Sequence, residues 1–286
     1  MRTAMLADLN CRYSTYRQMA ALLLGVCLGL ISLPTPAADA EFRILTTEEP
    51  PANYTVGNEI TGITTDVVND LRARLGEKTP IEIQPWSRVQ QTAQLRPNVL
   101  IFTLGRTPER VAMGLTFIGP ITTRKHMVYK RTDSYLKVDN FEDITLHNLI
   151  VGGMRGDWRT KLMKDHGARV DEAVTHAASL KLLMRGRIDL IAISDMELKV
   201  DAALAGVSPD KLTPAFVISE APAFIAFSKG TPAATINRWQ RAFAEFQASD
   251  VPAKLAKKWG RVLGEPMGYA PDKGFYLTAT EAGITR

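Results

Sequence analysis

Cysteine is nearly absent from this chain of 286 residues, and its two cysteines, Cys11 and Cys27, both lie in the first 40 residues. The residues that follow can therefore form no disulfide, no thiolate metal site and no cysteine nucleophile. The four histidines show no His-Glu-x-x-His spacing, and no Gly-x-Ser-x-Gly elbow occurs. We therefore expect no catalytic residue, no bound metal and no cofactor, and a chain that is stabilised by its packed core.

Long apolar runs are also missing after residue 40, where no stretch reaches the roughly 18 residues of a membrane-spanning helix. Within the first 40 residues, three arginines precede an apolar run at 19–33 and an Ala38-Asp39-Ala40 cleavage pattern. This order is typical of a secretory signal peptide, with the mature chain starting at Glu41. We therefore expect an exported, periplasmic protein.

A strong charge of one sign is lacking as well. The net charge of the whole chain is +5, and removal of the first 40 residues leaves 32 basic and 28 acidic residues, scattered along the sequence. Nucleic-acid-binding proteins usually concentrate basic residues on one face or in one run. We therefore expect no nucleic-acid partner.

Apolar periodicity predicts strands that alternate with helices. The strands are expected at 42–46, 81–83, 99–102, 149–152 and 190–193, and the helices at 64–75, 89–95, from Thr107, at 158–166, 178–184, 195–204, after Thr231-Pro232 and at 251–259. This order is typical of an α/β fold in which the sheets are largely parallel.

Two extended stretches, 122–131 and 223–227, border the middle unit and are interpreted as crossings between two lobes. The expected organisation is a signal peptide at 1–40, a first lobe at 41–127 and 223–264, a second lobe at 128–222 and a C-terminal tail at 265–286. The tail shows no periodicity, so no structure is predicted for it.

The segment 97–110 carries an unusual charge arrangement. Thr107 is a good N-cap and Pro108 suits the first helical position, but Arg106 and Arg110 add positive charge to the positive end of a helix. An anion, such as a ligand carboxylate, would explain this arrangement. The alternative is that Glu109 or another acid neutralises both arginines at the surface.

Two aromatic residues are further candidates for ligand contacts. Trp86 follows a proline at the end of a strand, where it could stack on a ligand or pack in the core. Tyr54 ends a proline-rich loop, and the same two possibilities apply to it.

Several motifs together resemble the bacterial extracellular solute-binding proteins of family 3, the periplasmic receptors for polar amino acids. The motifs are Gly62-Ile63-Thr64-Thr65-Asp66-Val67-Val68, Pro85-Trp86, Thr107-Pro108-Glu109-Arg110 with Phe117 and Gly119-Pro120, Leu182-Leu183-Met184-Arg185-Gly186-Arg187-Ile188-Asp189, and the segment 254–259. The resemblance implies a two-lobed periplasmic-binding-protein type II fold, in which each lobe is a sheet flanked by helices and two hinge crossings join the lobes. It also implies a monomer that closes on a small-molecule ligand and works with an inner-membrane ABC permease.

The resemblance assigns roles to individual residues. It implies that Arg110 binds the α-carboxylate of the ligand, and that the second lobe contributes at Gly156-Asp157, where the family usually has Gly-Thr or Gly-Ser. The family aspartate that holds the α-amino group corresponds in spacing to Ser194, with Asp195 one residue later. The aromatic residue of the family's Pro-Pro loop is missing, and Tyr54 follows instead. These departures bear on the identity of the ligand rather than on the fold.

Three functions follow from this comparison. The first is a binding protein that captures a small polar solute, such as an amino acid or a related carboxylate, by hinge closure and delivers it to an ABC transporter. The second is an enzyme on the same fold that is similar to cyclohexadienyl dehydratases, and the third is a stand-alone sensory receptor. A dehydratase needs an acid and a base that face the cleft, and the sequence offers no convincing pair.

Overall fold

The structure is a computed structural model that describes residues 41–278. The expected signal peptide, with its cleavage site and both cysteines, lies outside these residues. Ten strands form one sheet in the order β4-β1-β5-β10-β6-β9-β7-β8, with a β11–β12 hairpin joined to β6 through β12. A separate hairpin consists of β2 (Tyr54–Val56) and β3 (Glu59–Thr61).

The first part of the sheet has the expected parallel strands. Strand β1 (Arg43–Thr46) lies parallel to both β4 (Ile81–Ile83) and β5 (Val99–Gly105). The helices that follow these strands are α2 (Ile63–Leu75), α3 (Trp86–Leu95) and the short α4 (Pro108–Ala112). Two C-terminal helices, α9 (Ala233–Ala248) and α10 (Val251–Leu263), complete this part.

The second part repeats the arrangement. Strand β7 (Ile150–Met154) lies parallel to β8 (Arg169–Ala173) and to β9 (Leu190–Ser194). Its helices are α5 (Phe141–Leu146), α6 (Trp158–Asp165), α7 (His176–Met184) and α8 (Asp195–Ala205), followed by the 3-10 turn η1 (Pro209–Lys211).

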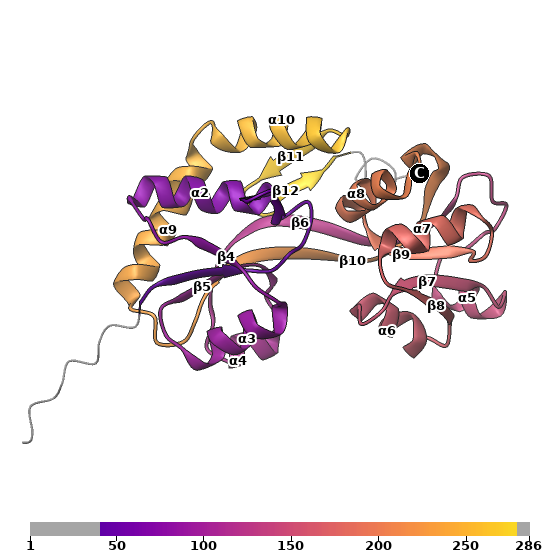
Figure 1. Cartoon of the computed structure of the whole chain (residues 1–286), viewed down its shortest axis with the longest axis horizontal. Coiled ribbons are helices and arrows are strands. Elements are labelled where there is room, and N and C mark those ends of the chain that lie inside the picture. Colours follow the sequence, from indigo (N-terminus) through magenta and orange to yellow (C-terminus); the bar gives the residue numbers. More distant parts are fainter. Residues whose placement is uncertain (1–40, 279–286) are drawn as a thin grey trace, which may run out of the picture. The chain divides into compact units, whose positions relative to one another are not determined.

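Two antiparallel strands of 16 residues, β6 (Thr116–Arg131) and β10 (Leu212–Phe227), run through both parts of the sheet (Figure 1). Ile118 and Ile121 of β6 pack in the first part, whereas Met127 and Tyr129 of the same strand pack in the second. The stretches expected to be crossings, 122–131 and 223–227, are therefore parts of two continuous strands. The lobe boundaries at 127/128 and 222/223 fall inside these strands and stay a proposal.

Each part is a sheet between two helical layers, because successive side chains of a strand point to opposite faces. In the first part, Ile44 packs with α2, α9 and α10, whereas Leu45 packs with α3 (Figure 1). In the second part, Ile191 and Ile193 pack with α7 and α8, whereas Leu190 and Ala192 pack with α5 and α6. The fold is thus a two-lobed α/β fold, as expected.

The alternation breaks at Thr103 in β5. Leu100 and Phe102 face α2, and regular alternation would turn Leu104 the same way, yet Leu104 packs on the α3 side. Thr103 has a φ of 66°, a conformation that is costly for a β-branched residue, and the pairing of β5 with β10 shifts beside it. The irregularity turns the Thr103 hydroxyl toward Thr64 of α2, 2.7 Å away, and reorients the strand just before Gly105 and α4.

The proline-rich loop is held on the start of α2. Gly62, the N-cap of α2, has a φ of 134°, and a Cβ there would come within 2.1 Å of the Ala52 carbonyl oxygen. The backbone N–H groups of Ile63 and Thr64 donate to the carbonyl oxygens of Pro51 and Ala52, at 3.0 and 2.9 Å. Glycine therefore lets the loop approach the helix, and the loop in turn places Glu49.

Some elements differ from the sequence expectation. Helix α3 begins at Trp86 rather than Val89, and β8, α5 and the hairpin of β11 (Met267–Ala270) and β12 (Gly274–Leu277) were not expected. The hairpin lies in the C-terminal tail, for which no structure was predicted, and its Phe275 and Leu277 are buried in the core with α9. It went undetected because each of its strands has four residues, too few to show a period.

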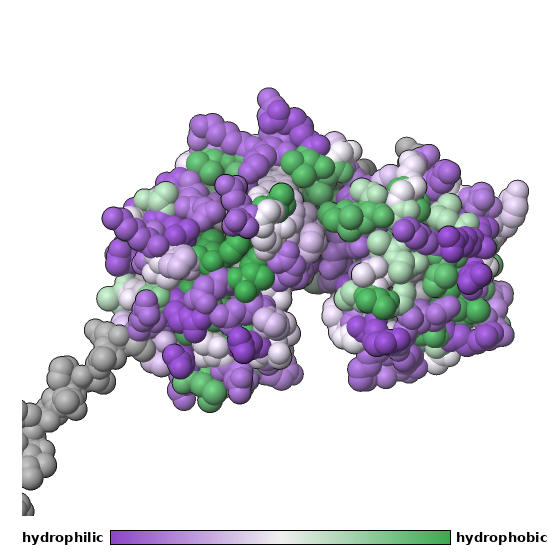
Figure 2. All heavy atoms as spheres, viewed as in Figure 1, coloured by the Kyte–Doolittle hydropathy of each residue, from purple (hydrophilic) through white to green (hydrophobic). Residues whose placement is uncertain are grey.

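No helix within residues 41–278 combines the length and the apolar character needed to span a bilayer. Hydrophilic side chains cover most of the face in Figure 2, and apolar side chains form separate small patches among them.

Candidate functional site

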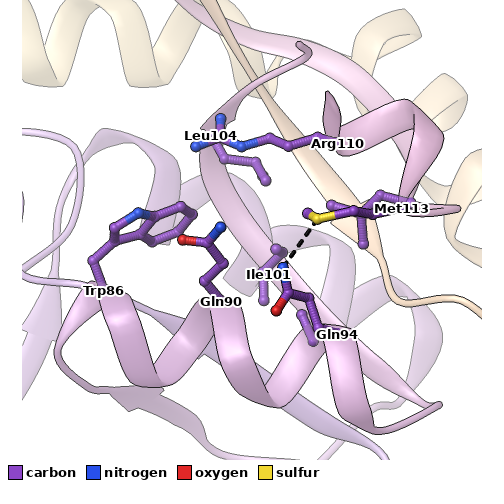
Figure 3. Close-up of a pocket in the computed structure, with 9 residues that line it drawn as sticks. Trp86, Gln90, Gln94, Ile101, Leu104, Arg110 and Met113 are labelled. Atoms are coloured by element: carbon purple, nitrogen blue, oxygen red, sulfur yellow. Dashed lines mark hydrogen bonds between the residues drawn. The ribbon is translucent and has the colours of Figure 1, made fainter. Parts of the chain in front are cut away.

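Arg110 lies in the first turn of α4, where Thr107 caps the helix by accepting a hydrogen bond from the Arg110 backbone N–H at 3.4 Å. Its Nη1 donates to the carbonyl oxygen of Gly105 at 2.6 Å, and its guanidinium lies 5.2 Å from the centre of the Trp86 ring (Figure 3). Within residues 41–278, no carboxylate approaches this guanidinium to within 4 Å. The structure therefore contains no direct ion pair between Arg110 and Glu109.

The electrostatics of Arg110 fit an unsatisfied cation. Burial lowers the pKa of Arg110 below its ordinary value, and the charges of Glu109 and Glu49 partly offset this effect. A half-buried guanidinium that lacks an ion pair keeps donors available for an anion, and its planar fork suits a carboxylate.

The other candidate ligand contacts of the first lobe, Trp86, Arg106 and Tyr54, pack in different places. Trp86 opens α3 and lines one small pocket together with Gln90, Gln94, Met113 and Arg110 (Figure 3). Arg106 is exposed, and its guanidinium lies 6.0 Å from the Phe117 ring instead. Tyr54 packs against the core with α2, whereas Trp86 packs on the α3 face of the sheet. The structure thus pairs Arg110 with Trp86, and it places Tyr54 mainly in core packing.

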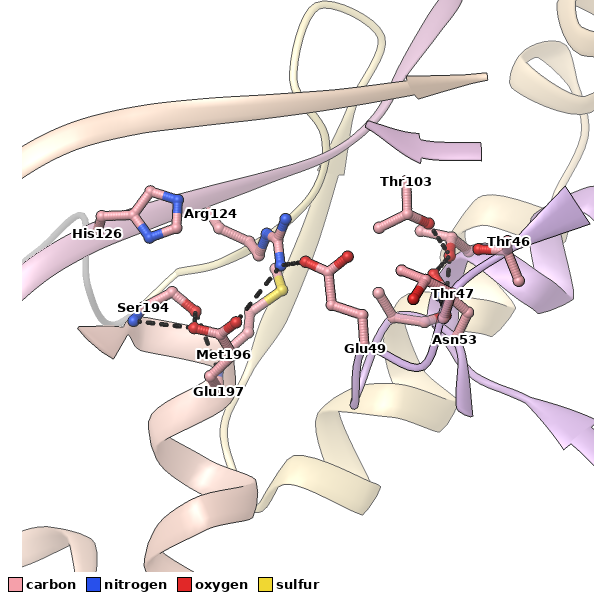
Figure 4. Close-up of polar contacts among 12 residues, drawn as sticks. Thr46, Thr47, Glu49, Asn53, Thr103, Arg124, His126, Ser194, Met196 and Glu197 are labelled. Atoms are coloured by element: carbon pink, nitrogen blue, oxygen red, sulfur yellow. Dashed lines mark hydrogen bonds and ion pairs between the residues drawn. The ribbon is translucent and has the colours of Figure 1, made fainter. Parts of the chain in front are cut away.

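A chain of five charged residues was not anticipated from the sequence. Arg124 of β6 forms an ion pair with Glu49 of the proline-rich loop and lies 3.9 Å from Glu197 of α8 (Figure 4). Arg159 of α6 reaches the other carboxylate oxygen of Glu197 at 2.5 Å and binds Asp157 at 2.5 Å. We call these five residues the charge chain, and it joins the loop after β1 to the helices of the second part of the sheet.

Helix capping positions the acidic members of this chain. Asp157 is the N-cap of α6 and accepts the backbone N–H of Arg159 at 2.7 Å. Ser194 is the N-cap of α8, and its hydroxyl donates to the Glu197 carboxylate at 2.8 Å and accepts the Glu197 backbone N–H at 3.2 Å. The Ser-x-x-Glu spacing is a sequence signal of such a capping box and could have drawn attention to Glu197.

The candidate residues of the second lobe all have partners within the protein. The carboxylate of Asp157 is engaged by Arg159, the hydroxyl of Ser194 by Glu197, and the carboxylate of Asp195 by the backbone N–H groups of Lys125 and Met196, at 3.1 and 2.8 Å. Their contact with a ligand stays a prediction. Gly156 is exposed with a φ of 78°, so its backbone stays accessible.

The pKa values in the charge chain follow from burial and pairing. Burial alone would raise the pKa of Glu197, but Arg159 and Arg124 hold it at about 2. For Asp157, burial is outweighed by the hydrogen bonds from His176 and Arg159, which hold its pKa well below the usual range. Both carboxylates are therefore charged at neutral pH and act as fixed partners of the arginines.

His126 of β6 is part of the same surroundings. Its Nδ1 lies 3.3 Å from Nη1 of Arg159, and its ring is nearly perpendicular to the Trp158 ring, with the ring centres 4.9 Å apart. Burial and the charges of Arg159 and Arg124 lower the pKa of His126 to about 3. His126 is thus neutral at physiological pH, with Nδ1 as the acceptor of the Arg159 donor.

The neutral His126 predicts a loss of stability in mild acid. Because its pKa is lower in the folded state than in the unfolded one, the unfolded chain takes up more protons between about pH 6.5 and pH 3, and the free energy of unfolding falls by at most about 1.4 kcal/mol per pH unit from this group. His126→Gln keeps an acceptor for Arg159 and is expected to flatten the slope from pH 6.5 to 5. Urea unfolding at several pH values measures it.

The exposed His147 offers a matched control, since His147→Gln is expected to leave the slope unchanged. Below about pH 4.5, protonation of Glu197 and Asp157 adds a further loss in both variants, because their folded pKa values lie below the unfolded ones. An identical slope for His126→Gln and the wild type above pH 5 would contradict a buried neutral His126.

A cavity of about 260 Å³ lies beside the charge chain. The loop after β1, the end of β7, the start of α7 and one face of α8 line it; the lining residues are Glu48, Glu49, Pro50, Met154, Thr175, His176, Glu197, Val200, Asp201 and Leu204. Within residues 41–278, no group of three His, Asp or Glu side chains is arranged to hold a metal ion. The lining of the cavity presents carboxylates and hydrogen-bonding side chains.

Comparison with known proteins gives the family. The model of the bacterial extracellular solute-binding proteins, family 3, matches residues 42–262. The chain belongs to this family. A search of curated protein sequences gave no match.

Solved structures support the fold of this family-3 protein. The P235GK mutant of ArgBP from T. maritima is 18% identical, with a TM-score of 0.60 over 77% of this chain and 95% of the other. The ancestral amino acid-binding protein AncCDT-1, described as a precursor of cyclohexadienyl dehydratase, is 20% identical, with a TM-score of 0.59 over 76% and 94%. A histidine kinase sensor domain with similarity to periplasmic binding proteins is 16% identical, with a TM-score of 0.62 over 77% and 96%. At these identities the likeness establishes the type II fold alone.

Proposed function

We propose that this family-3 protein is a periplasmic binding protein that captures an amino acid or a related carboxylate and delivers it to an inner-membrane ABC permease. The observation that carries the proposal is the Arg110 guanidinium, which is half-buried beside Trp86 and has no carboxylate within 4 Å among the described residues. A ligand carboxylate completes this site with two parallel charged hydrogen bonds. Arg106 and the accessible backbone at Gly156 are further proposed contacts.

The comparisons support an amino-acid ligand without deciding it. ArgBP from T. maritima is described in an arginine-bound form, AncCDT-1 is described as an amino acid-binding protein, and the family is one of solute-binding proteins. We infer binding rather than catalysis, because the carboxylates of the charge chain are paired with arginines and do not form an available acid and base. We further propose export through the leader at 1–40 and a monomeric state, which N-terminal sequencing of periplasmic material and light scattering can check.

A thermal-shift screen across amino acids and small organic acids tests the proposal. A ligand at 100 times its dissociation constant stabilises the folded state by about 2.7 kcal/mol, so the melting temperature is expected to rise by several degrees. Organic cations without a carboxylate serve as the negative comparison. If no carboxylate-containing solute raises the melting temperature, the proposed function is wrong.

Ligand is also expected to favour a closed arrangement of the two lobes. The two strands β6 and β10 join the lobes, and a ligand that contacts both sides binds the closed form better. Small-angle scattering with a saturating ligand from the screen should therefore give a smaller radius of gyration. An unchanged radius with a ligand that binds tightly would argue against hinge closure.

A further inference from the structure

Thr103 has an unusual backbone conformation inside a buried strand. Its φ of 66° lies in the left-handed region, which a β-branched residue rarely adopts, and the residue is only 6% exposed. The pairing of β5 with β10 shifts next to it, between Phe224 and Ile225. Strain of this kind persists only where surrounding contacts hold it, and it concentrates at functional sites. A contact of Thr103 must therefore offset the strain.

The contact that holds Thr103 is a hydrogen bond to Thr64 of α2, with 2.7 Å between the two hydroxyl oxygens. The Thr64 hydroxyl also lies 2.8 Å from the carbonyl oxygen of Ala52 and 3.0 Å from Oδ1 of Asn53. The amide nitrogen of Asn53 donates to the Thr47 carbonyl, which fixes the orientation of the Asn53 side chain. Both oxygens beside Thr64 can therefore only accept a hydrogen bond. The single proton of the Thr64 hydroxyl goes to the loop, and the Thr103 hydroxyl donates to Thr64.

This hydrogen-bond network is buried and joins four segments. The hydroxyl of Thr46 donates to the carbonyl oxygen of Phe102 at 3.3 Å, and the side chains of Thr46, Asn53 and Thr103 lie close together in Figure 4. Thr46, Asn53 and Thr64 are at most 1% exposed. The network thus ties the end of β1, the proline-rich loop and the start of α2 to the end of β5. A buried network whose members are satisfied favours one geometry.

One end of the network leads to Arg110. Thr103 stands two residues before Gly105, whose carbonyl oxygen accepts a hydrogen bond from Nη1 of Arg110 at 2.6 Å. Carbonyl groups alternate in direction along a regular strand, so the irregularity at Thr103 decides which way the Gly105 carbonyl points. It also sets the position at which α4 leaves the sheet, and with it the place of the Arg110 guanidinium beside Trp86 (Figure 3).

The other end of the network leads to Glu49. The backbone N–H of Glu49 donates to the Asn53 carbonyl oxygen at 2.7 Å, and the backbone N–H of Asn53 donates to the Glu49 carbonyl oxygen at 3.1 Å. Glu49 forms the ion pair with Arg124, and its charge also acts on Arg110. The network therefore fixes the cation at the start of α4 and the acid of the proline-rich loop relative to each other.

We propose that the hydrogen bond between Thr103 and Thr64 positions Arg110 for the ligand carboxylate. The bond holds the displaced end of β5 on α2, so that the Gly105 carbonyl engages one donor of the guanidinium and the other donors serve the anion. Thr103 and Thr64 are positioning residues that act through Arg110 and do not touch the ligand. The inference rests on the proposed function, in which Arg110 binds the carboxylate.

Heteronuclear NMR of the isotopically labelled, ligand-free protein tests this role. The Nε–H signal of Arg110, assigned by its loss in Arg110→Lys, reports on the position of the guanidinium because the ring current of Trp86 acts on it. Thr64→Val removes the acceptor of Thr103 with little change of shape and is expected to move or broaden the signal. Thr64→Ser keeps a hydroxyl and should retain the wild-type signal. An unchanged signal in Thr64→Val would overturn the proposal.

Thr65→Val is the matched control. Thr65 is the next residue of α2, is equally buried, and its hydroxyl donates to the Thr61 carbonyl oxygen at 3.2 Å. Its substitution should lower the ligand-free melting temperature, as Thr64→Val does, but leave the Arg110 signal in place. An equal displacement of the signal in both variants would show general loosening and refute the positioning role. If Thr64→Val does not fold, Thr103→Gly replaces it with the same displacement expected, since glycine tolerates the positive φ but lacks the hydroxyl.

Sodium acetate serves as a minimal carboxylate probe in the same experiment, with sodium chloride at equal concentration as the comparison. Acetate is expected to shift the Arg110 signal of the wild type, and Thr64→Val should need about 3- to 30-fold more acetate for the same effect. An equal acetate dependence of the two proteins would overturn the positioning role. If acetate has no effect on the wild type while the signal still depends on Thr64, the carboxylate site is refuted and the positioning of the guanidinium stands.

Discussion

Arg110→Ala is expected to abolish most ligand binding while leaving the ligand-free protein intact. Removal of a charge-assisted pair in a closed site costs about 2 to 5 kcal/mol, which corresponds to roughly 30-fold to several thousand-fold in affinity. Arg110→Lys should restore little of it, because an ammonium group cannot make the two parallel bonds of a guanidinium. Calorimetry with the strongest ligand of the thermal-shift screen measures the effect.

Arg88→Ala is the matched control for this experiment. Arg88 is exposed on α3, on the opposite side of that helix from Trp86, so its removal should not change binding. Wild-type affinity in the Arg110→Ala variant would remove Arg110 from the site and make Arg106 the next candidate.

Arg159→Ala is expected to have the largest effect on stability. Its side chain is 5% exposed and bonds to Asp157, which is equally buried, and to Glu197. The substitution takes the arginine away from the buried Asp157 and leaves Glu197 with Arg124 alone, 3.9 Å away. Removal of one partner of a buried ion pair typically costs about 3 to 5 kcal/mol. Urea unfolding at pH 7 should show this decrease in the free energy of unfolding.

Lys161→Ala tests whether the effect comes from burial rather than from loss of any ion pair. Lys161 lies on the same helix α6 and pairs with Asp165 at 2.5 Å, but both side chains are more than half exposed. Such a pair contributes at most about 1 kcal/mol. If Arg159→Ala destabilised the protein no more than Lys161→Ala, the buried charge chain would be refuted.

Local patterns predicted most of the fold. The apolar spacing of α2 and α9 matched the faces that these helices bury; α2 ended at Leu75 and α4 began after its N-cap Thr107, as expected. The misses were short elements such as α5, β8 and the β11–β12 hairpin, in which four to six residues are too few to establish a period.

The candidate site was predicted unevenly. Arg110 and Trp86 could be singled out, since a cation at a helix start and an aromatic residue after a proline are local signals, and the structure brings them together. Asp157, Ser194 and Asp195 stay predicted ligand contacts, and the structure adds that Asp157 and Ser194 cap helices and that Asp195 accepts the backbone N–H of Lys125. Arg124 and Arg159 carried no local signal, because an arginine in a strand or helix is ordinary until its burial is known.

The sequence by itself determined the α/β alternation, the family and the arginine at the start of α4, because these depend on residues that are neighbours along the chain. Only the tertiary structure decided that Glu49, Arg124, Glu197 and Arg159 form one buried chain of charges, since these residues are separated by up to 148 positions. Their pKa values and the acidic cavity beside them depend on burial and on distances across space. Those quantities arise only when β6 and β10 bring the loop after β1 next to α6 and α8.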